Sequence, residues 1–378
     1  MKTGEFDTQM MARAIQLAKQ GRFGTSPNPR VGCVITRKTS LIAEGWHARA
    51  GEGHAEVNAL AALAPGEAKG ATAYVTLEPC SHRGRTGPCA DALVAAGLAR
   101  VVVAMTDPNP LVAGKGIEKL RSAGIQVDVG VLESQAAALN PGYIRRIQGG
   151  QPWVRMKSAM SLDGRTAMAS GESYWITGPE ARADVQRLRA LSCAIVSGVE
   201  TVLADDPAFT VRPEDFSVEG ADPVWRQPIR VILDSQLRTP LKAKLLQGGG
   251  PLLILTGASK MDSPAAEALR KCGVEVNEVA QGEEGGLLLS AVMAELARRG
   301  CNEVMVEAGA TVSGAFLQAG LVDEWFIYMA PSLMGSAGRP LMNWPMETMA
   351  QRRELEIVDI RAVGRDWRWQ CRLAKKEN

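Results

Sequence analysis

The sequence predicts an α/β protein of two domains. Apolar segments of roughly four to eight residues, the usual length of strands, alternate with amphipathic helical segments along the chain. This alternation is typical of sheets that are covered by helices. A stretch containing glycine and proline interrupts it at residues 147–152, which suits a junction between domains. The chain has 378 residues, enough for two domains, and we expect one over residues 1–147 and another over residues 148–378.

The first domain is expected to open with a helix over residues 7–20, where apolar side chains recur at helical spacing until Gly21 ends the run. Further helices are expected at residues 54–63, 89–97 and 117–123, and strands at residues 31–35, 71–77, 101–105 and 126–129. The starts of two of these helices and the end of one strand carry the most informative residues of the chain.

The second domain is expected to be another α/β layer structure of over two hundred residues. Its strands are expected at residues 153–160, 194–197, 229–233, 252–256, 303–307 and 324–330, and its helices at residues 179–190, 263–272, 287–298 and 312–319. No internal repeat relates this half of the sequence to the first half.

The chain has only three histidines, and one of them forms a candidate zinc site with two cysteines. His54 is followed by Glu56, and Cys80 and Cys89 come further along the chain. Three protein ligands leave a coordination position open for water, whose pKa zinc lowers to ~7. Zinc nucleobase deaminases combine these residue types, with the glutamate serving as acid and base rather than as ligand. This chain departs from the deaminase signature in its cysteine spacing: eight residues separate Cys80 from Cys89, whereas the signature has two residues between its cysteines.

Two simpler interpretations of these residues stay open. The histidine and cysteines could form a structural zinc knot, or they could be buried thiols without metal. The other cysteines are scattered singly in apolar runs, which suits buried, reduced thiols. They are Cys33, Cys193, Cys272, Cys301 and Cys371. Residues 1–20 mix charged and short apolar stretches, unlike a secretory signal or membrane span, so we expect a cytoplasmic location and no membrane partner.

The second domain has no histidine, and its clearest ligand signal is a strand–turn–helix segment at residues 306–315. Free backbone N–H groups at such a helix start could bind a diphosphate, although a tight turn with no ligand explains Gly309 equally well. The segment lacks the G-x-G-x-x-G pattern of Rossmann domains. Loops at residues 158–165, 171–177 and 201–207 could carry function or be solvated connections. Helical spacing alone makes Arg189 a surface charge.

Charge and composition argue against a nucleic-acid partner. The formal net charge is +2, and aromatic residues make up 5% of the chain. Proteins that bind single strands combine a basic groove with stacking aromatics, and duplex readers concentrate basic residues on one face. We therefore do not expect nucleic acid as the main partner.

Eight short segments in a fixed order extend these observations over nearly the whole chain. They are Asn28-Pro29-x-Val31-Gly32, His54-Ala55-Glu56, Thr76-Leu77-Glu78-Pro79-Cys80-Ser81-His82, Gly87-Pro88-Cys89, Ser161-Leu162-Asp163-Gly164, Trp175-Ile176-Thr177, Leu203-Ala204-Asp205-Asp206-Pro207 and Glu307-Ala308-Gly309. In these segments the chain resembles the bifunctional deaminase-reductase family of riboflavin biosynthesis. The gap between the cysteines is the spacing of that family.

The resemblance implies a cytidine-deaminase-like three-layer domain followed by a dihydrofolate-reductase-like domain. It also implies Zn²⁺ in the first and NADPH in the second. The substrate would be a phosphorylated pyrimidine, 2,5-diamino-6-ribosylamino-4(3H)-pyrimidinone 5′-phosphate. The first domain would remove an amine from its ring, and the second would reduce the ribosyl group to ribityl, giving 5-amino-6-ribitylamino-uracil 5′-phosphate.

The resemblance also assigns site residues by position. In the first domain His54, Cys80 and Cys89 would bind zinc, Glu56 would be catalytic, and the substrate would be held by Asn28, His47, His82, Arg85 and Thr86. NADPH would contact Ala159, Trp175, Thr201, Asp205, Ser235, Gly309, Ala310, Thr311, Val312, Ser313, Gly314 and Ala315. The reductase substrate would contact Ser173, Arg189, Arg212 and Glu307.

The competing hypothesis is a nucleic-acid or nucleoside deaminase whose C-terminal domain is a non-catalytic binding module. In either case we expect a homodimer or a larger homo-oligomer.

Overall fold

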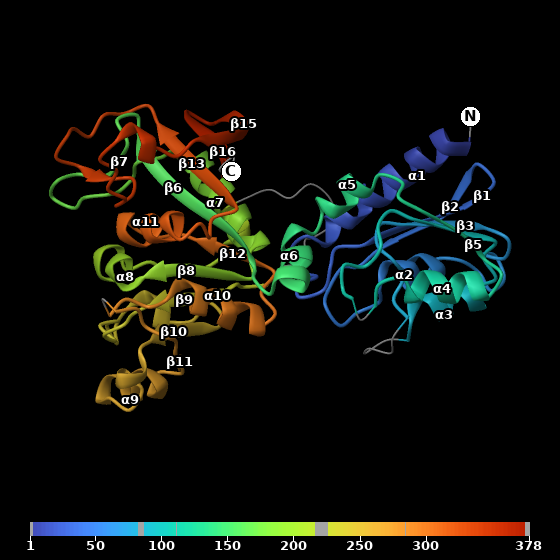
Figure 1. Ribbon diagram of the computed structural model, residues 1–378, viewed down its shortest axis with the longest axis horizontal. Helices are drawn as coiled ribbons and strands as arrows, with labels where there is room; N and C mark the ends of the chain where they lie inside the picture. The colour runs from blue at the N-terminus through green and yellow to red at the C-terminus, as the bar shows by residue number, and fades with distance from the viewer. Residues whose placement is uncertain (1–2, 82–86, 111, 216–225, 284, 375–378) are drawn as a thin grey trace. The chain divides into compact units, whose positions relative to one another are not determined.

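The computed structural model describes residues 3–81, 87–110, 112–215, 226–283 and 285–374 (Figure 1). These form two compact units, one mainly of residues up to Gly150 and the other mainly of residues from Gln151 onward. The last helix of the first unit, α6 (Pro141–Gly149), starts with a proline in its first turn and ends at Gly150 in the left-handed conformation. The predicted domain boundary between residues 147 and 148 stays a prediction.

The first unit contains a mixed sheet in the order β2-β1-β3-β4-β5. The pairs β1–β2 and β1–β3 are antiparallel, whereas β3–β4 and β4–β5 are parallel. The strands are β1 (Gly32–Arg37), β2 (Ser40–Trp46), β3 (Thr72–Val75), β4 (Arg100–Val103) and β5 (Gln126–Val129). The helices before α6 are α1 (Thr3–Ala18), α2 (Ala55–Ala61), α3 (Cys89–Ala95), α4 (Lys115–Ser122) and α5 (Glu133–Ala137).

Two glycines let helices approach both faces of this sheet. A Cβ atom at Gly32 would lie 2.0 Å from the carbonyl oxygen of Ala14 in α1, and one at Gly45 would lie 2.4 Å from the backbone nitrogen of Ala59 in α2. Gly45 pairs with Cys33, the residue after Gly32, so the two glycines face opposite sides of the sheet. Figure 1 shows α1 on one side and α2, α3 and α4 together on the other. The unit therefore has three layers, as predicted.

The second unit is built on a sheet in the order β11-β10-β9-β8-β12-β6-β13-β16-β15. Its strands are parallel from β11 to β13, while β16 and β15 are antiparallel to their neighbours. They are β6 (Trp153–Ser161), β8 (Ala194–Gly198), β9 (Ile229–Leu233), β10 (Leu252–Thr256), β11 (Glu275–Glu278), β12 (Glu303–Val306), β13 (Glu324–Ala330), β15 (Leu355–Val363) and β16 (Asp366–Leu373). Two short strands, β7 (Arg165–Ala167) and β14 (Arg339–Pro340), form a separate pair.

Helices cover both faces of this second sheet. One buried apolar cluster packs α10 (Leu289–Arg298) and α11 (Ala310–Gln318) against one face. The other cluster packs α7 (Pro179–Leu191), α8 (Val199–Asp205) and α9 (Pro264–Lys271) against the opposite face. The central strands β8, β10 and β12 are buried along their whole length, so both of their faces are covered, which explains their mainly apolar sequences.

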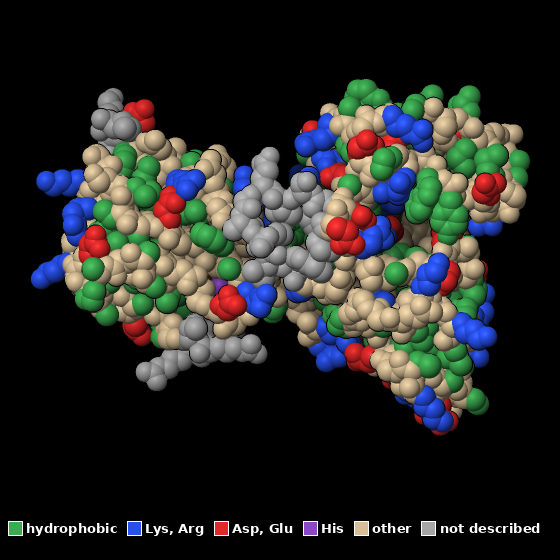
Figure 2. Space-filling view, turned by 180° about the vertical axis from the view of Figure 1, so that it is seen from behind, with side chains coloured by type: hydrophobic (Ala, Val, Ile, Leu, Met, Phe, Trp, Pro, Cys, Tyr) green, Lys and Arg blue, Asp and Glu red, His purple; other side chains and the backbone are tan. Residues whose placement is uncertain are grey.

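The surface mixes the two signs of charge. On the face that Figure 2 draws, Lys and Arg side chains are interspersed with Asp and Glu side chains over both units. Among the residues described, no helix combines the length and apolar character that crossing a membrane requires. Cys272 is exposed, so the expectation that every cysteine outside the zinc site is buried was wrong for this one, which follows the last turn of α9.

Candidate functional sites

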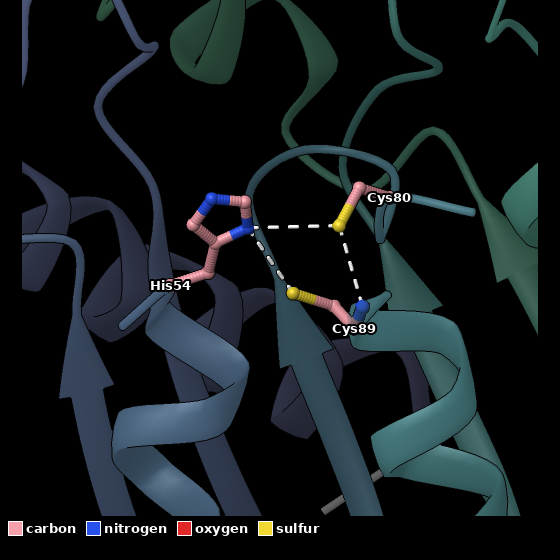
Figure 3. A group of neighbouring side chains, drawn as sticks. All are labelled: His54, Cys80 and Cys89. Atoms are coloured by element: carbon pink, nitrogen blue, oxygen red, sulfur yellow. Dashed lines mark hydrogen bonds between the residues drawn. The ribbon is translucent and has the colours of Figure 1, made fainter. Parts of the chain in front are cut away.

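Three side chains from separate elements converge beyond the end of β3, the central strand of the first sheet (Figure 3). His54 is the residue before α2, Cys80 lies in the loop after β3, and Cys89 is the first residue of α3. The Nδ1 atom of His54 lies 3.2 Å from Sγ of Cys89 and 3.6 Å from Sγ of Cys80. The backbone N–H of Cys89 donates to Sγ of Cys80 at 3.3 Å. The predicted ligands are therefore brought together.

The donor set fits a zinc ion. All three ligand atoms lie within 4.8 Å of one another. Zinc bonds of ~2.3 Å to sulfur and ~2.0 Å to nitrogen in a tetrahedron place ligand atoms about 3.5–3.8 Å apart, close to the two distances from Nδ1. One imidazole and two thiols also suit the ion chemically.

Cys80 is prepared to act as a thiolate ligand. The hydrogen bond from the Cys89 thiol is the largest contribution that lowers the pKa of Cys80, to about 4, and the contact with His54 adds to it. The hydrogen bond that the Cys89 thiol donates to Cys80 also raises the pKa of Cys89, because it stabilises the protonated thiol. A metal ion replaces that proton, because metal-binding thiols are deprotonated.

Glu56 lies in the first turn of α2, two residues after His54, and is 3% exposed. Burial is the main cause that raises the pKa of this carboxyl to about 7, and the charge on Cys80 adds to the effect. A carboxyl with a pKa near neutrality can both accept and return a proton, which is the property that an acid–base catalyst needs.

Asn28 and His47 lie beside the metal ligands and contact each other. The side-chain nitrogen of Asn28 lies 3.1 Å from Nε2 of His47, and Nδ1 of His47 lies 3.0 Å from the carbonyl oxygen of Gly53. The His47 ring packs edge-on against the His54 ring, with centroids 5.2 Å apart. Burial lowers the pKa of His47, which favours the neutral ring. The other predicted deaminase residues, His82, Arg85 and Thr86, lie outside the described residues.

Glu78 fixes the zinc loop, a role that was not predicted from the sequence. Its buried carboxylate accepts backbone N–H bonds from Asp107 at 3.1 Å, Gly114 at 2.9 Å, Gly116 at 2.8 Å and Ile117 at 3.3 Å. Glu78 thereby ties the segment leading to Cys80 to the start of α4. The position of Glu78 directly before Pro79 and Cys80 was the only feature of the sequence that could have indicated this role. The four N–H donors lie at least 29 residues further along the chain, so the sequence does not show that they meet Glu78.

We expect Glu78→Ala to weaken zinc binding by roughly 10- to 100-fold, since outer residues that orient metal ligands have effects of this size. Competition with a chromogenic chelator measures the affinity. Glu118→Ala, an exposed position on α4, is the matched control and should bind zinc as the unchanged protein does. Equal affinities of the two variants would show that Glu78 does not position the ligands.

In the second unit, several predicted residues lie beyond the carboxyl ends of parallel strands, where α/β sheets commonly bind ligands. Glu307 follows β12, Ser235 follows β9 by two residues, and Thr201 lies in the helix directly after β8. Ala159 is a half-buried residue of β6, the strand next to β12.

Arg189 and Glu307 form a bidentate ion pair between α7 and the end of β12. Nε and Nη2 of Arg189 donate to the two carboxylate oxygens at 2.9 and 3.0 Å. Arg189 is therefore not the solvated surface charge that helical spacing suggested. Lys157 of β6 was not predicted as a site residue, and its Nζ lies 3.6 Å from the same carboxylate. Burial alone would raise the pKa of Glu307, but the two cations outweigh it and lower the pKa to about 2.

Ser173 and Asp205, predicted to contact substrate and NADPH respectively, are hydrogen-bonded to each other at 3.1 Å. The Tyr174 hydroxyl donates to the carbonyl oxygen of Asp205 at 2.7 Å. Trp175 is 67% exposed, and the guanidinium of Arg182 lies over its ring at 4.5 Å from the centroid. The two hydrogen bonds to Asp205 hold the 171–177 loop against the end of α8, and the Arg182 contact joins the loop to α7.

The predicted diphosphate segment starts α11. Gly309 is the residue before this helix, and its N–H donates to the Thr201 hydroxyl at 3.3 Å. Thr311 is exposed, whereas Ser313 and Gly314 are buried. A Cβ atom at Gly314 would lie 2.1 Å from the carbonyl oxygen of Asn343, so that side of the helix is already packed.

The side chain of Arg212 is more exposed than that of Arg189, 49% against 12%, and it pairs with Asp215 at 2.6 Å. No contact of Arg212 with Glu307 is present among the residues described. Its backbone N–H donates to the side chain of Gln186 in α7, at 3.1 Å, which places it near the helix that carries Arg189.

Both halves of the chain match known protein families. Residues 4–105 match the cytidine and deoxycytidylate deaminase zinc-binding region, and residues 152–368 match the RibD C-terminal domain. The riboflavin biosynthesis protein RibD of Escherichia coli K12 is 49% identical over 367 residues, which covers 95% of this chain and 97% of that protein. The RibD of Haemophilus influenzae is 45% identical over 370 residues, which covers 96% and 97%.

Solved structures give the same result. The structure of Acinetobacter baumannii RibD has a TM-score of 0.90 and 45% identity, covering 98% of this chain and 100% of that one. A diaminohydroxyphosphoribosylaminopyrimidine deaminase/5-amino-6-(5-phosphoribosylamino)uracil reductase from Thermotoga maritima has a TM-score of 0.84 and 31% identity, covering 98% and 99%. The chain thus belongs to the RibD family of riboflavin biosynthesis, and it is a bifunctional enzyme with a zinc-dependent deaminase domain and an NADPH-dependent reductase domain.

Proposed function

We propose that the first unit hydrolytically deaminates 2,5-diamino-6-ribosylamino-4(3H)-pyrimidinone 5′-phosphate. The second unit then reduces the ribosyl group of the product to ribityl, leaving the phosphate in place. The observation that carries the proposal is the convergence of His54, Cys80 and Cys89 beside the buried carboxyl of Glu56. The name of the Thermotoga maritima relative, which describes both reactions on such compounds, supports the choice of substrate.

In the deamination, Glu56 is the proton carrier. A zinc ion held by His54, Cys80 and Cys89 would supply Lewis acidity and lower the pKa of the attacking water. The Glu56 carboxylate takes a proton from the attacking water and delivers it to the pyrimidine ring nitrogen. Glu56 then carries the remaining proton of the attacking oxygen to the departing amine, so that the C–N bond breaks, ammonia leaves and the oxygen becomes the ring carbonyl. The raised pKa of Glu56 supports both transfers near neutral pH.

Asn28 and His47 position the pyrimidine. The Gly53 carbonyl accepts from the Nδ1–H of His47, so Nε2 of the neutral ring is free to accept from the amide nitrogen of Asn28. Because the amide nitrogen of Asn28 must face Nε2 of His47 to donate to it, the amide oxygen of Asn28 points away from His47. An amide oxygen held in this way suits an amine group of the substrate. His82, Arg85 and Thr86 remain predicted substrate contacts.

We expect Asn28→Ala to raise the KM of deamination by roughly tenfold, the loss of about one hydrogen bond to substrate. Zinc content and reductase activity in the same preparation serve as internal controls and should not change. Steady-state release of ammonia measures the KM. An unchanged KM would remove Asn28 from the substrate site.

In the reduction, the protein binds and orients both partners, and NADPH supplies the hydride to C1′ of the sugar. The N-terminus of α11, with Thr201 and Asp205, is the proposed cofactor site, and Ala159, Trp175, Ser235 and the residues from Gly309 to Ala315 complete it. Arg189, Arg212, Glu307 and Ser173 are the proposed substrate contacts. Arginine suits the substrate phosphate, because its guanidinium can bind two phosphate oxygens at once.

A coupled assay tests the two reactions together. Zinc-loaded protein given the diaminopyrimidinone and NADPH should release ammonia and consume NADPH in equal amounts. NADPH consumption without ammonia release would contradict the proposed order. We also propose a cytoplasmic location, where a reducing environment keeps Cys80 and Cys89 available for zinc, and a homo-oligomeric state.

A further inference from the structure

Arg230, a residue of β9, is a buried cation that binds only backbone carbonyl groups. It is 2% exposed, and burial lowers the pKa of its guanidinium. Nη1 donates to the carbonyl oxygens of Leu245 at 2.6 Å and Ala208 at 3.3 Å, and Nη2 donates to that of Gly250 at 2.6 Å. Within the described ranges no carboxylate contacts it. Because an unpaired buried charge is costly, its contacts indicate a role beyond stability.

These contacts join the turn at residues 245–250 to the segment 208–212, which leads to Arg212. A Cβ atom at Gly249, whose φ is +91°, would lie 2.3 Å from Cγ2 of Thr210. The side-chain amide of Gln227, two residues before β9, both donates to the carbonyl oxygen of Val211 and accepts from its N–H, each at 2.9 Å. The turn, Arg230 and Gln227 therefore hold the segment 208–212 together.

The segment held in this way contains a strained residue. Phe209 has a φ of +52°, in the left-handed region that a bulky side chain rarely adopts. Its ring is buried and lies 5.8 Å from the guanidinium carbon of Arg189. The next residue, Thr210, accepts a hydrogen bond from Nη1 of Arg189 on its carbonyl oxygen at 3.0 Å. A strained conformation persists only where its surroundings hold it, so the contacts to Arg189 depend on them.

Arg189 is thereby fixed from two sides. Glu307 accepts from Nε and Nη2, and the segment 208–212 supplies the carbonyl group of Thr210 and the ring of Phe209. A guanidinium has five N–H groups, and three of these are used. One N–H on each Nη of Arg189 has no partner among the residues that the structure describes. Those two groups can bind a substrate.

We propose that Arg230 is a positioning residue of the reductase. It holds the segment 208–212 in its strained conformation, and the segment fixes the guanidinium of Arg189 for the substrate. The inference rests on the proposed function, because it takes Arg189 as a substrate contact. Arg230 itself touches no substrate and acts through Phe209 and Thr210.

Arg230→Met tests this role, because methionine is long and unbranched but donates no hydrogen bond. The KM for the deaminated ribosyl compound should rise roughly tenfold, since a small displacement of a positioned group is enough for such an effect. The KM for NADPH and the rate of deamination should stay unchanged. A variant that is only less stable would lose active protein and keep the KM for the ribosyl compound, and that result would overturn the inference. Thermal unfolding measures the stability separately.

A double-variant cycle shows whether Arg230 acts through Arg189. Arg189→Met should raise the same KM, and the double variant should match Arg189→Met alone, because both changes remove one interaction. Effects that multiply would overturn the inference. A raised KM in Arg189→Met beside an unchanged KM in Arg230→Met would overturn it and leave the proposed function standing. An unchanged KM in Arg189→Met would contradict the proposed substrate contact and the inference with it.

Gly249→Ala tests the same arrangement without changing the buried charge. Its new methyl group would press on Thr210, so the KM for the deaminated ribosyl compound should rise. Gly248→Ala is the matched control: Gly248 has a φ of +113°, and a Cβ atom there would meet no atom within 4 Å. Both variants carry a similar backbone cost, but only the first disturbs the segment 208–212. Equal KM values for the two variants would contradict the proposed positioning.

Discussion

Replacing Glu56 with glutamine is expected to reduce the deaminase kcat by about 1,000-fold while zinc stays bound. Acid–base catalysis by a positioned side chain contributes roughly 10²- to 10⁴-fold, and glutamine cannot carry a proton. Glu56 is not among the three ligand residues, so metal content by atomic absorption should equal that of the unchanged protein. Turnover at a normal rate would show that another group moves the proton.

The matched variant for this experiment is Cys80→Ser, which removes a zinc ligand. It is expected to lose both bound zinc and deamination, so the two variants separate the proton carrier from the metal site. Reductase activity measured with previously deaminated substrate should survive in both. Its loss would mean that the second unit depends on the fold of the first.

Replacing Glu307 with glutamine is expected to destabilise the reductase unit by roughly 3 kcal/mol at pH 7 and to lower reductase activity. The side chains of Arg189 and Lys157 are 12% and 18% exposed, so the change leaves two largely buried cations without their carboxylate. Breaking a buried ion pair costs about 3–5 kcal/mol. Chemical unfolding followed by tryptophan fluorescence measures the difference. Glu267→Gln, an exposed glutamate of α9, is the control.

The acid dependence of this difference follows from the lowered pKa of Glu307, about 2 when folded. A carboxyl whose pKa is depressed by folding stabilises the protein above its unfolded pKa, ~4.3, and loses that contribution as pH falls through the folded value. The stability gap between Glu307→Gln and the unchanged protein should therefore be constant at neutral pH and narrow below about pH 4. A gap independent of pH would contradict the ionised pair.

The zinc site could be predicted from the sequence because its ligands lie within short motifs. His54 and Cys89 occupy helix starts, and Cys80 follows a strand, so the local pattern already indicated where they would meet. The long gap between the cysteines departs from the short deaminase signature, and only the resemblance to the riboflavin family accounted for it. The match of the second unit to the RibD C-terminal domain also removes the basis for a non-catalytic binding module.

The partners of the reductase residues could not be predicted in the same way. Arg189 and Glu307 are 118 residues apart, and their contact depends on how α7 packs beside β12. Lys157 joins them from β6, inside an apolar segment that reads as an ordinary strand. Glu78 likewise acts through backbone N–H groups, which leave no trace in the sequence.

The strands β15 and β16 were also missed. The bulge at β15 breaks its alternation, and charged residues interrupt the apolar positions on both strands. Strand prediction relies on unbroken apolar runs or regular alternation, and it therefore succeeded for the buried parallel strands and failed for β15 and β16.

The mass of the product tests the central claim, that one chain carries out zinc-dependent deamination followed by reduction. Zinc-loaded protein should convert the diaminopyrimidinone to the deaminated ribosyl compound without NADPH, and to the deaminated ribityl compound with it. Protein stripped of zinc should leave the substrate unchanged under both conditions. A ribityl product that still carries the ring amine would contradict this order of reactions.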